Sequence, residues 1–233
     1  MNLRELVDMT VAKVRSPSQA DASIDISDAF VTELINEGLH HIERQALWEF
    51  AETAAIITAI SGIPTTPVPD DCHTTLKAIN TRTGIDLEFT DVRQEMGHYK
   101  FDNYILPGFR PHVQGEITHY GLWTNQYIWG PIPRRDTQIN LRYYRHFPRL
   151  EEDEDEPIIP ETYHDILTNY AASRLILALP AEGNRYLPWS MAEPYEQMWQ
   201  QGLQEMLNSP LVVIQDQIPL QEYEEFIWTE RPF

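Results

Sequence analysis

The sequence contains very little cysteine and no long apolar run. Its 233 residues include a single cysteine, Cys72, so no disulfide can form within the chain. No apolar stretch approaches the roughly 20 residues that a membrane-spanning helix requires. The opening segment Met1–Glu5 also lacks the basic and then apolar layout of a signal peptide. We therefore expect a soluble protein that is made and assembled in a reducing cytoplasm.

Basic residues are scarce as well. The chain has 17 Lys and Arg against 36 Asp and Glu, a formal net charge of −19. Residues 151–233 carry 17 of the acids and only 3 of the bases, so the C-terminal third is the acidic part. An acidic surface repels phosphate, which argues against the wrapping of nucleic acid. Two explanations stay open: a surface past which DNA slides without being gripped, or charge that keeps a large oligomer soluble.

The motifs of common catalytic sites are missing from the sequence. It has no Gly-rich phosphate loop, no G-x-S-x-G elbow, no H-E-x-x-H helix and no setting for a Cys/His nucleophile. We therefore predict no enzyme and no cofactor. One alternative is a carbohydrate-active enzyme or sugar-binding module, because Trp123, Tyr127 and Trp129 could stack on a sugar beside a pair of carboxylates.

Three groups of potential metal ligands are better explained without a metal. His40 and His41 are neighbours on a predicted helix, where adjacent side chains point about 100° apart. Residues Asp70–His73 lie in a proline-rich turn and mix hard with soft ligands. The acidic run Glu151–Glu156 lacks the glycine and the ligand spacing of a calcium loop. We expect no bound metal.

What the chain does contain supports a stable core and an α+β fold. Its apolar content is 42% and its aromatic content 11%, and its length permits one large core or two modest ones. We predict a helical bundle formed by N- and C-terminal helices, with an embedded antiparallel β domain and an extended C-terminal arm. The predicted boundaries are 1–51 and 158–209 for the bundle, 52–148 for the β domain, 149–157 for an acidic loop and 210–233 for a C-terminal docking extension.

Apolar residues recur with helical spacing in four segments: 3–15, 27–50, 160–179 and 190–208. The second helix would be capped by Ser27 or Asp25 and bury a face from Phe30 to Phe50. The third would begin at Pro160 and bury a face that reaches Leu177 and Ala178. A stripe on the last helix predicts core packing, with a docking groove as the alternative, and its members are Trp189, Tyr195, Met198, Trp199 and Met206.

Between residues 52 and 148 the pattern changes to that of β-strands. Apolar and β-branched runs bounded by Gly and Pro predict a mainly antiparallel region. A short helix is expected to begin at Thr90. The predicted strands are 54–60, 76–80, 85–89, 116–123, 126–129 and 137–144.

Six consecutive acids precede the third predicted helix. Because like charges repel one another and stay hydrated, we expect a solvated loop with an electrostatic role. The six are Glu151, Glu152, Asp153, Glu154, Asp155 and Glu156.

Five arginines gather just before the acidic run. A ring of identical subunits would bring the arginines of one copy against the acids of the next, so we favour a subunit interface; the alternative is the solvent face of a hairpin. The five are Arg134, Arg135, Arg142, Arg145 and Arg149.

The last residues of the chain, 211–233, mix apolar with acidic side chains. They are too apolar for a free solvated tail, so we expect this extension to lie on another surface. The residues expected to dock are Ile218, Tyr223, Phe226, Ile227, Trp228 and Phe233.

Three stretches carry a resemblance to a known family: Trp129-Gly-Pro-Ile-Pro, the segment 138–150, and the helix pattern P-x-x-Y-x-x-x-L-x-x-x-A that starts at Pro160. They resemble the head-to-tail adaptor proteins of tailed bacteriophages, also called connector, head-completion or tail tubular protein A proteins. The layout is similar too: N-terminal helices, a β region, two further helices and an extension. The resemblance is specific over about 129–176 and includes no catalytic residue.

The resemblance implies a non-enzymatic structural protein of the virion neck, assembled in the host cytoplasm. It would form a dodecameric ring beneath the portal, extend the DNA channel and provide a platform for the tail. Its partners would be further copies of itself, the portal protein, tail or nozzle proteins, and genomic DNA that passes without sequence-specific binding; no membrane is involved. The acidic run would line the lumen or act electrostatically, and the C-terminal extension would dock on the portal or a neighbour. A tail-completion protein of different position is the remaining alternative.

Overall fold

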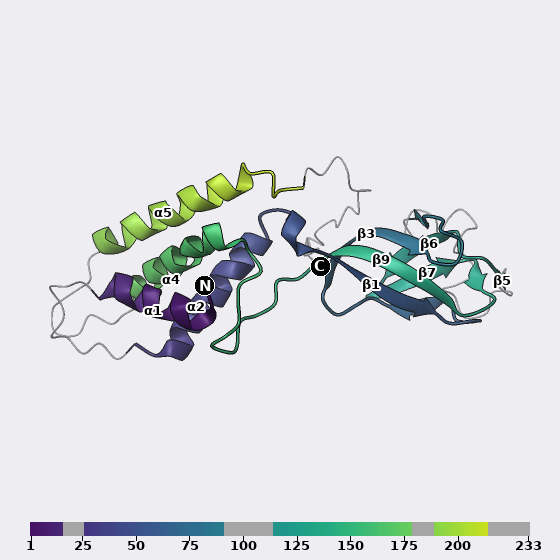
Figure 1. Cartoon of the computed structure of the whole chain (residues 1–233), viewed down its shortest axis with the longest axis horizontal. Helices are drawn as coiled ribbons and strands as arrows, with labels where there is room; N and C mark the ends of the chain where they lie inside the picture. Colours follow the sequence, from purple (N-terminus) through teal and green to yellow (C-terminus); the bar gives the residue numbers. More distant parts are fainter. Residues whose placement is uncertain (16–25, 91–113, 179–188, 214–233) are drawn as a thin grey trace, which may run out of the picture. The chain divides into compact units, whose positions relative to one another are not determined.

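The chain folds as an α+β protein. The computed structural model describes residues 1–15, 26–90, 114–178 and 189–213. These residues divide into two compact units, a helical unit (Met1–Glu52 with Tyr144–Val213) and a β unit that comprises Thr53–Tyr143. Figure 1 shows the helices and strands of each unit. Among the described residues, no helix is long and apolar enough to cross a membrane.

The helical unit begins with α1 (Leu3–Val14), which starts at a complete capping box. The Asn2 side chain accepts from the backbone N–H of Glu5 at 2.9 Å, and the Glu5 carboxylate accepts from that of Asn2 at 3.1 Å. The predicted apolar face is confirmed, because the buried residues of the helix are Leu3, Leu6, Val7, Thr10 and Val14.

Helix α2 (Asp28–Glu43) is shorter than the sequence predicts. Beyond its end, the Trp48 indole N–H donates to the carbonyl of Ile42 at 2.9 Å, which satisfies a terminal carbonyl of the helix. Phe50 falls in the separate turn η2 (Glu49–Ala51), so the prediction of one helix over 27–50 is wrong at its C-terminal end. Phe30, predicted to be buried, is 43% exposed. Ser27 occupies the N-cap position without a side-chain capping bond.

Helix α4 (His164–Ala178) contacts α1, α2 and α5 (Trp189–Leu207), as Figure 1 shows. It follows the turn η3 (Glu161–Tyr163), whose N-cap is Pro160, so the α-helix itself begins four residues later than predicted. Leu177, at its end, is exposed rather than buried. Close packing with α5 depends on Gly202, because a Cβ at that position would lie 2.7 Å from the Ile166 side chain.

The β unit contains three sheets of mixed type. Strands β2–β7 and β6–β7 pair antiparallel, as predicted for this region, and β4–β6 and β5–β8 add two short parallel pairs that the sequence did not predict. The parallel pairs join strands that are far apart in sequence, where no tight hairpin fixes the direction. The three sheets comprise β1 (Glu52–Ala59), β9 (Thr137–Arg145) and β3 (Cys72–Asn80); β2 (Thr65–Pro67), β7 (Gln126–Gly130), β6 (His119–Trp123) and β4 (Glu88–Phe89); and β5 (Gln114–Gly115) with β8 (Ile132–Pro133).

Aromatic side chains form much of the core of the β unit. Tyr127 and Trp129 are fully buried and stack with their ring centroids 5.6 Å apart, and Tyr120 meets Tyr127 edge-on at 5.9 Å. The β6–β7 hairpin that carries them turns at Thr124 and Asn125, both at positive φ, as two-residue hairpin loops require. The predicted strand over 85–89 is reduced to Glu88–Phe89. The short helix predicted from Thr90 falls on residues outside the described ranges.

Candidate functional site

A cleft of about 330 Å³ opens in the helical unit between α2 and the segment that follows β9. Its walls carry three carboxylates, a histidine and an arginine beside apolar side chains. The lining residues are Glu33, Asn36, Glu37, Leu39, His40, Glu43, Phe147, Pro148 and Arg149.

Asn36 fixes one wall of the cleft to the other. Its amide nitrogen donates to the carbonyl of Leu150 at 2.9 Å, and its amide oxygen accepts from the N–H of Leu150 at 2.9 Å. Arg149, one residue earlier, forms an ion pair with Glu33 of α2. The segment after β9 is therefore held along α2 by two hydrogen bonds between the Asn36 side chain and the Leu150 backbone and by one ion pair.

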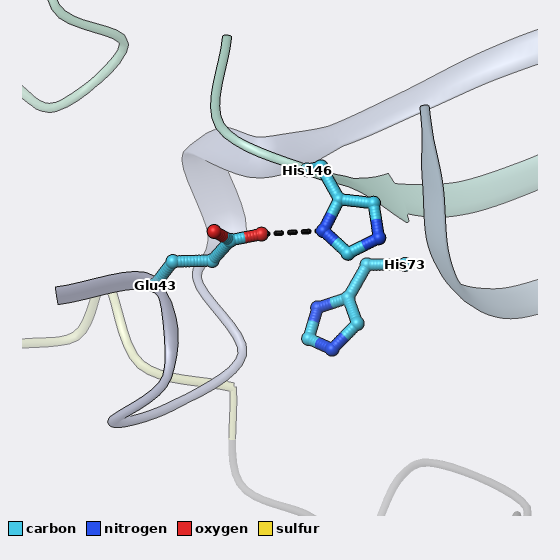
Figure 2. A group of neighbouring side chains, drawn as sticks. All are labelled: Glu43, His73 and His146. Atoms are coloured by element: carbon cyan, nitrogen blue, oxygen red, sulfur yellow. Dashed lines mark hydrogen bonds and ion pairs between the residues drawn. The ribbon is translucent and has the colours of Figure 1, made fainter. Parts of the chain in front are cut away.

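Glu43 lines the cleft and is a buried charge, with its side chain only 8% exposed. Its two oxygens lie 2.6 Å from Nδ1 of His146 and 3.0 Å from Nδ1 of His40. Figure 2 shows the contact between Glu43 and His146. Burial acts to raise the pKa of Glu43, but the hydrogen bonds from His146 and His40 outweigh it and hold the pKa below its ordinary value.

Sequence reasoning missed Glu43, although a signal for it exists. The residue lies four positions after Leu39 and one after Ile42, on the buried face of α2. A carboxylate on such a face requires hydrogen-bonding partners, because an isolated buried charge is costly. The identity of those partners, and of His146 above all, depends on tertiary structure.

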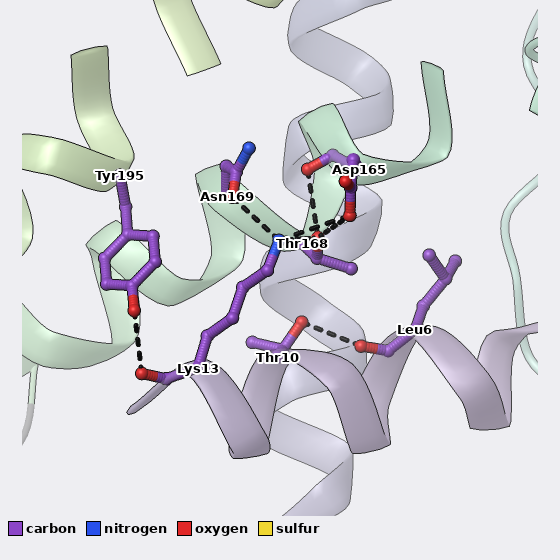
Figure 3. Close-up of polar contacts among 7 residues, drawn as sticks. All are labelled: Leu6, Thr10, Lys13, Asp165, Thr168, Asn169 and Tyr195. Carbon is purple, nitrogen blue, oxygen red and sulfur yellow. Dashed lines mark hydrogen bonds and ion pairs between the residues drawn. The ribbon is translucent and has the colours of Figure 1, made fainter. Parts of the chain in front are cut away.

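A second polar cluster joins α1 to α4 and α5 (Figure 3). The Lys13 ammonium donates to Thr168 at 2.5 Å, Asn169 at 2.7 Å and Asp165 at 3.3 Å, which uses all three of its protons. The carbonyl of Lys13 accepts from the Tyr195 hydroxyl at 2.8 Å. Burial lowers the pKa of Lys13, and the charge of Asp165 opposes this effect. The cluster ties the first helix of the chain to the last two.

The acidic run is exposed, but it also caps α1. The carbonyls of Asp155 and Asp153 accept the backbone N–H groups of Leu3 and Arg4 at 2.8 and 3.2 Å. The Asp155 carboxylate accepts from the N–H groups of Glu151 and Glu152 at 2.8 and 2.9 Å, and these bonds lower its pKa. Asp155 therefore differs from the other five acids, because its side chain shapes the loop.

The five arginines do not form one stripe. Arg134, Arg135 and Arg142 belong to the β unit, whereas Arg145 and Arg149 belong to the helical unit. Arg135 pairs with Glu116 at 2.6 Å, and Arg149 pairs with Glu33, so these two arginines form ion pairs within the chain. Arg134 is exposed and makes no ion pair within the described ranges. Arg142 is exposed, and Nε of Arg145 is buried without a hydrogen-bond partner.

A family model describes nearly the whole chain. The model of the SU10 adaptor protein matches residues 1–217. The chain belongs to the SU10 adaptor protein family. This is a family of phage head-to-tail adaptors, so the predicted resemblance is confirmed and the chain is a structural adaptor protein of a bacteriophage particle. The family implies contact with portal and tail proteins. No curated protein matches the chain.

The sugar-binding surface considered from the sequence is not available in this adaptor. Tyr127 and Trp129 are both buried completely, and the Trp129 indole N–H donates to Thr66 at 2.9 Å. Only Trp123 of the three aromatics reaches the surface, at 37% exposure. The prediction that they could stack on a sugar together is wrong, because Tyr127 and Trp129 share the side of the hairpin that faces the core, whereas Trp123 lies on the other side.

Three of the side chains considered as metal ligands in the adaptor have partners within the chain. His40 contacts Glu43, and the ring of His41 lies 5.3 Å from that of Tyr170. Asp71 accepts from the Tyr143 hydroxyl at 2.9 Å. Cys72 is half-buried, and burial raises the pKa of its thiol, which makes it a poor nucleophile.

The C-terminal docking extension of the adaptor is described only at its start. Leu211 accepts from the N–H of Glu49 at 2.8 Å, and Val213 donates to Leu47 at 2.9 Å, so 211–213 belong to the helical unit. The proposed docking residues, Ile218 to Phe233, lie outside the described residues.

Proposed function

We propose that this adaptor assembles as a ring, dodecameric in its complete form, beneath the portal of a tailed phage. The ring extends the DNA channel and gives the tail its platform, and it assembles in the host cytoplasm before it becomes part of the virion neck. The family match over residues 1–217 carries this proposal. The separate helical and β units support it, because an adaptor must present one surface to the portal and another to the tail.

The acidic charge of the chain fits a channel through which DNA slides. The exposed acids Glu151–Glu154 and Glu156 sit on a loop that the backbone of α1 holds in place. A fixed ring of negative charge repels phosphate and prevents DNA from adhering to the wall. We assign these acids to the lumen or to its mouth.

The interface role proposed for the arginines concerns first the exposed residues Arg134 and Arg142. Arg134 is exposed and Arg142 lies on the exposed side of β9, so both can reach a neighbouring copy. Arg135 and Arg149 would first have to leave Glu116 and Glu33. Arg145 belongs to the helical unit, and its half-buried guanidinium suits a contact that completes its hydrogen bonds.

The C-terminal residues, from 214 onward, act as a docking element for the portal or for a neighbour. This is tested with the full chain and a variant that ends at Val213. A cut after Ser209 would be a poorer test, because it removes the backbone partners of Leu47 and Glu49. Purified portal is mixed with each protein, and ring formation is followed by native mass spectrometry and electron microscopy.

The expected result is a ring of the full chain on the portal, and a shortened protein that remains folded by circular dichroism but joins the portal weakly. A full-length protein that neither forms a ring nor binds portal contradicts the proposed function. Unchanged binding of the shortened protein contradicts the docking role alone.

A further inference from the structure

The strand β1 has an open edge. It is the outer strand of the sheet ordered β1–β9–β3, so its second edge has no strand partner in the part of the chain that the structure describes. Folded proteins usually protect such an edge with Lys or Pro, because it can pair with any other strand. From Thr53 to Ala59, β1 contains neither a charge nor a proline. The edge is therefore suited to the addition of another strand.

The solvent face of β1 is apolar. Ala55, Ile57 and Ala59 pack into the core, and the alternate residues point away from it. Ile56 is 65% exposed, the largest exposed fraction among the large apolar side chains of the described residues. Ile60, just beyond the strand, is 49% exposed. An exposed isoleucine on the edge strand and a second one directly after it indicate a surface that is covered in the working assembly.

A positive charge lies on the same face of the sheet. In β9, the neighbour of β1, Ile139 and Leu141 belong to the core, whereas Arg142 is exposed on the opposite side. Arg142 therefore shares the solvent face with Ile56. The face combines an open backbone edge, exposed isoleucines and an arginine. An extended segment that mixes apolar with acidic residues complements all three.

We propose that this edge and face of β1 bind the C-terminal segment, residues 214–233, of a second copy of the chain. The inference rests on the proposed function, because a closed ring needs a directional contact between two different surfaces of each copy. Twenty residues follow Val213, and in extended form they reach about 65 Å, far enough to cross to a neighbour. The segment carries five acids and one base.

The sequence of the segment matches the face of β1. Tyr223-Glu-Glu-Phe-Ile-Trp-Thr229 is rich in aromatic and β-branched residues, which favour strands. In a strand, Glu224, Phe226 and Trp228 share one side. Added beside β1, Phe226 and Trp228 cover Ile56, and Glu224 lies about 10 Å from β9, near enough for attraction to Arg142.

Cross-linking between differently labelled copies tests the contact. In a Cys72→Ser background, one copy carries Thr58→Cys on the exposed side of β1 and the other carries Thr229→Cys. Both full-length proteins are mixed, alone and with portal, and treated with a short bismaleimide. The matched control replaces Thr58→Cys with Ile85→Cys, a site of the same unit that is 57% exposed and lies outside β1.

We expect the β1 pair to give a covalent dimer at least about tenfold faster than the control pair, because docking raises the effective concentration of the two thiols. Equal rates for the two pairs overturn the proposal. A single chain that carries both Thr58→Cys and Thr229→Cys shows whether the bound C-terminal segment comes from the same copy. Cross-links within one chain, without covalent dimers, would assign the segment to the same copy and overturn docking on a second copy.

Ring formation in the same samples separates this inference from the proposed function. Rings on the portal without the β1 cross-link contradict the inference alone, whereas cross-linked pairs that never form rings contradict the proposed function. A second measurement uses Ile56→Asp, which should weaken self-association about tenfold because a charge enters the covered face. Ile85→Asp should leave self-association unchanged, and circular dichroism should show both variants folded. Equal self-association of these two variants also overturns the proposal.

Discussion

The two units of the adaptor are stabilised by different chemistry. In the helical unit, charged and amide side chains such as Lys13, Asn36 and Glu43 join segments from opposite ends of the sequence. In the β unit, which is one continuous stretch of the described chain, a core of apolar side chains and aromatic rings such as Tyr127 and Trp129 packs the strands together. The stability of the helical unit should therefore depend on pH, whereas the stability of the β unit should depend chiefly on the volume of its core side chains.

The largest effect is expected from a loss of aromatic volume in the β unit. Trp129→Ala should destabilise this unit by about 3–5 kcal/mol, because it leaves a cavity in the core and removes the stacking on Tyr127. Hydrogen exchange resolved by peptide should show faster exchange in β6, β7 and β9. The matched control is Trp123→Ala, at 37% exposure, which should cost far less. Equal losses for the two variants would contradict the contrast between core and surface.

Next in size is the loss of the buried carboxylate of the helical unit. Glu43→Gln should cost about 2 kcal/mol, because the amide NH₂ meets a histidine N–H donor in place of one charged oxygen. Glu37→Gln, on the same helix but 51% exposed, is the control. Urea unfolding measures both. A Glu43 variant as stable as the control would show that His40 and His146 do not stabilise the fold through this residue.

The pH dependence of Glu43 follows from the direction of its shift. Its pKa is lower in the folded state than the ordinary value of about 4.3, so it contributes stability above that pH. This contribution is lost as the pH falls through the folded pKa. Acid should therefore weaken the helical unit of the native protein more than that of Glu43→Gln.

A smaller effect is expected at His164, in milder acid. The ring is 3% exposed and its Nε2 lies 3.0 Å from the carbonyl of Ile159, while burial lowers its pKa. The charges of the N-terminus, Glu161 and Glu156 act on it as well. The unfolded chain then binds a proton more readily than the folded chain, so stability should fall as the pH drops below about 6.5. In the variant His164→Gln, the stability measured by unfolding should no longer fall below about pH 6.5 to the same extent. A variant whose stability has the same pH profile as that of the native protein would contradict this role of His164.

The periodicity of apolar residues predicted where the helices lie better than where they end. The buried face of α1 is as predicted, since capping and packing both involve neighbouring residues. The end of α2 is not, because it depends on Trp48, which caps Ile42, and on Val213, which pairs with Leu47 from far along the chain. The two parallel strand pairs were not predicted for a similar reason: long connections leave β4 and β5 free to pair parallel.

For the candidate site, the sequence patterns identified groups of charged residues but not the residues with which they pair. The acidic run and the arginines were visible, yet nothing in the sequence indicated that Asp155 would shape its own loop or that Glu116 would pair with Arg135. Lys13 and Glu43 were absent from the prediction, because the role of a single charged residue on an apolar helix face can be recognised only when its tertiary partners are known. The family resemblance supplied what local chemistry could not, and the family match confirms it.

The smallest effect is expected in the acidic loop, where one residue should behave unlike the others. Replacement of Glu151, Glu152, Glu154 and Glu156 by Gln, and of Asp153 by Asn, should leave the unfolding midpoint unchanged, because these side chains are exposed and accept no described hydrogen bond. Asp155→Asn should lower the midpoint, since the carboxylate accepts from two backbone N–H groups and thereby holds the carbonyls that cap α1. Thermal unfolding followed by circular dichroism compares the fivefold variant with the single one. The contrary result is a fivefold variant that unfolds less cooperatively while Asp155→Asn does not. It would show that the five exposed acids stabilise the helical unit and that Asp155 has no special structural role in this loop.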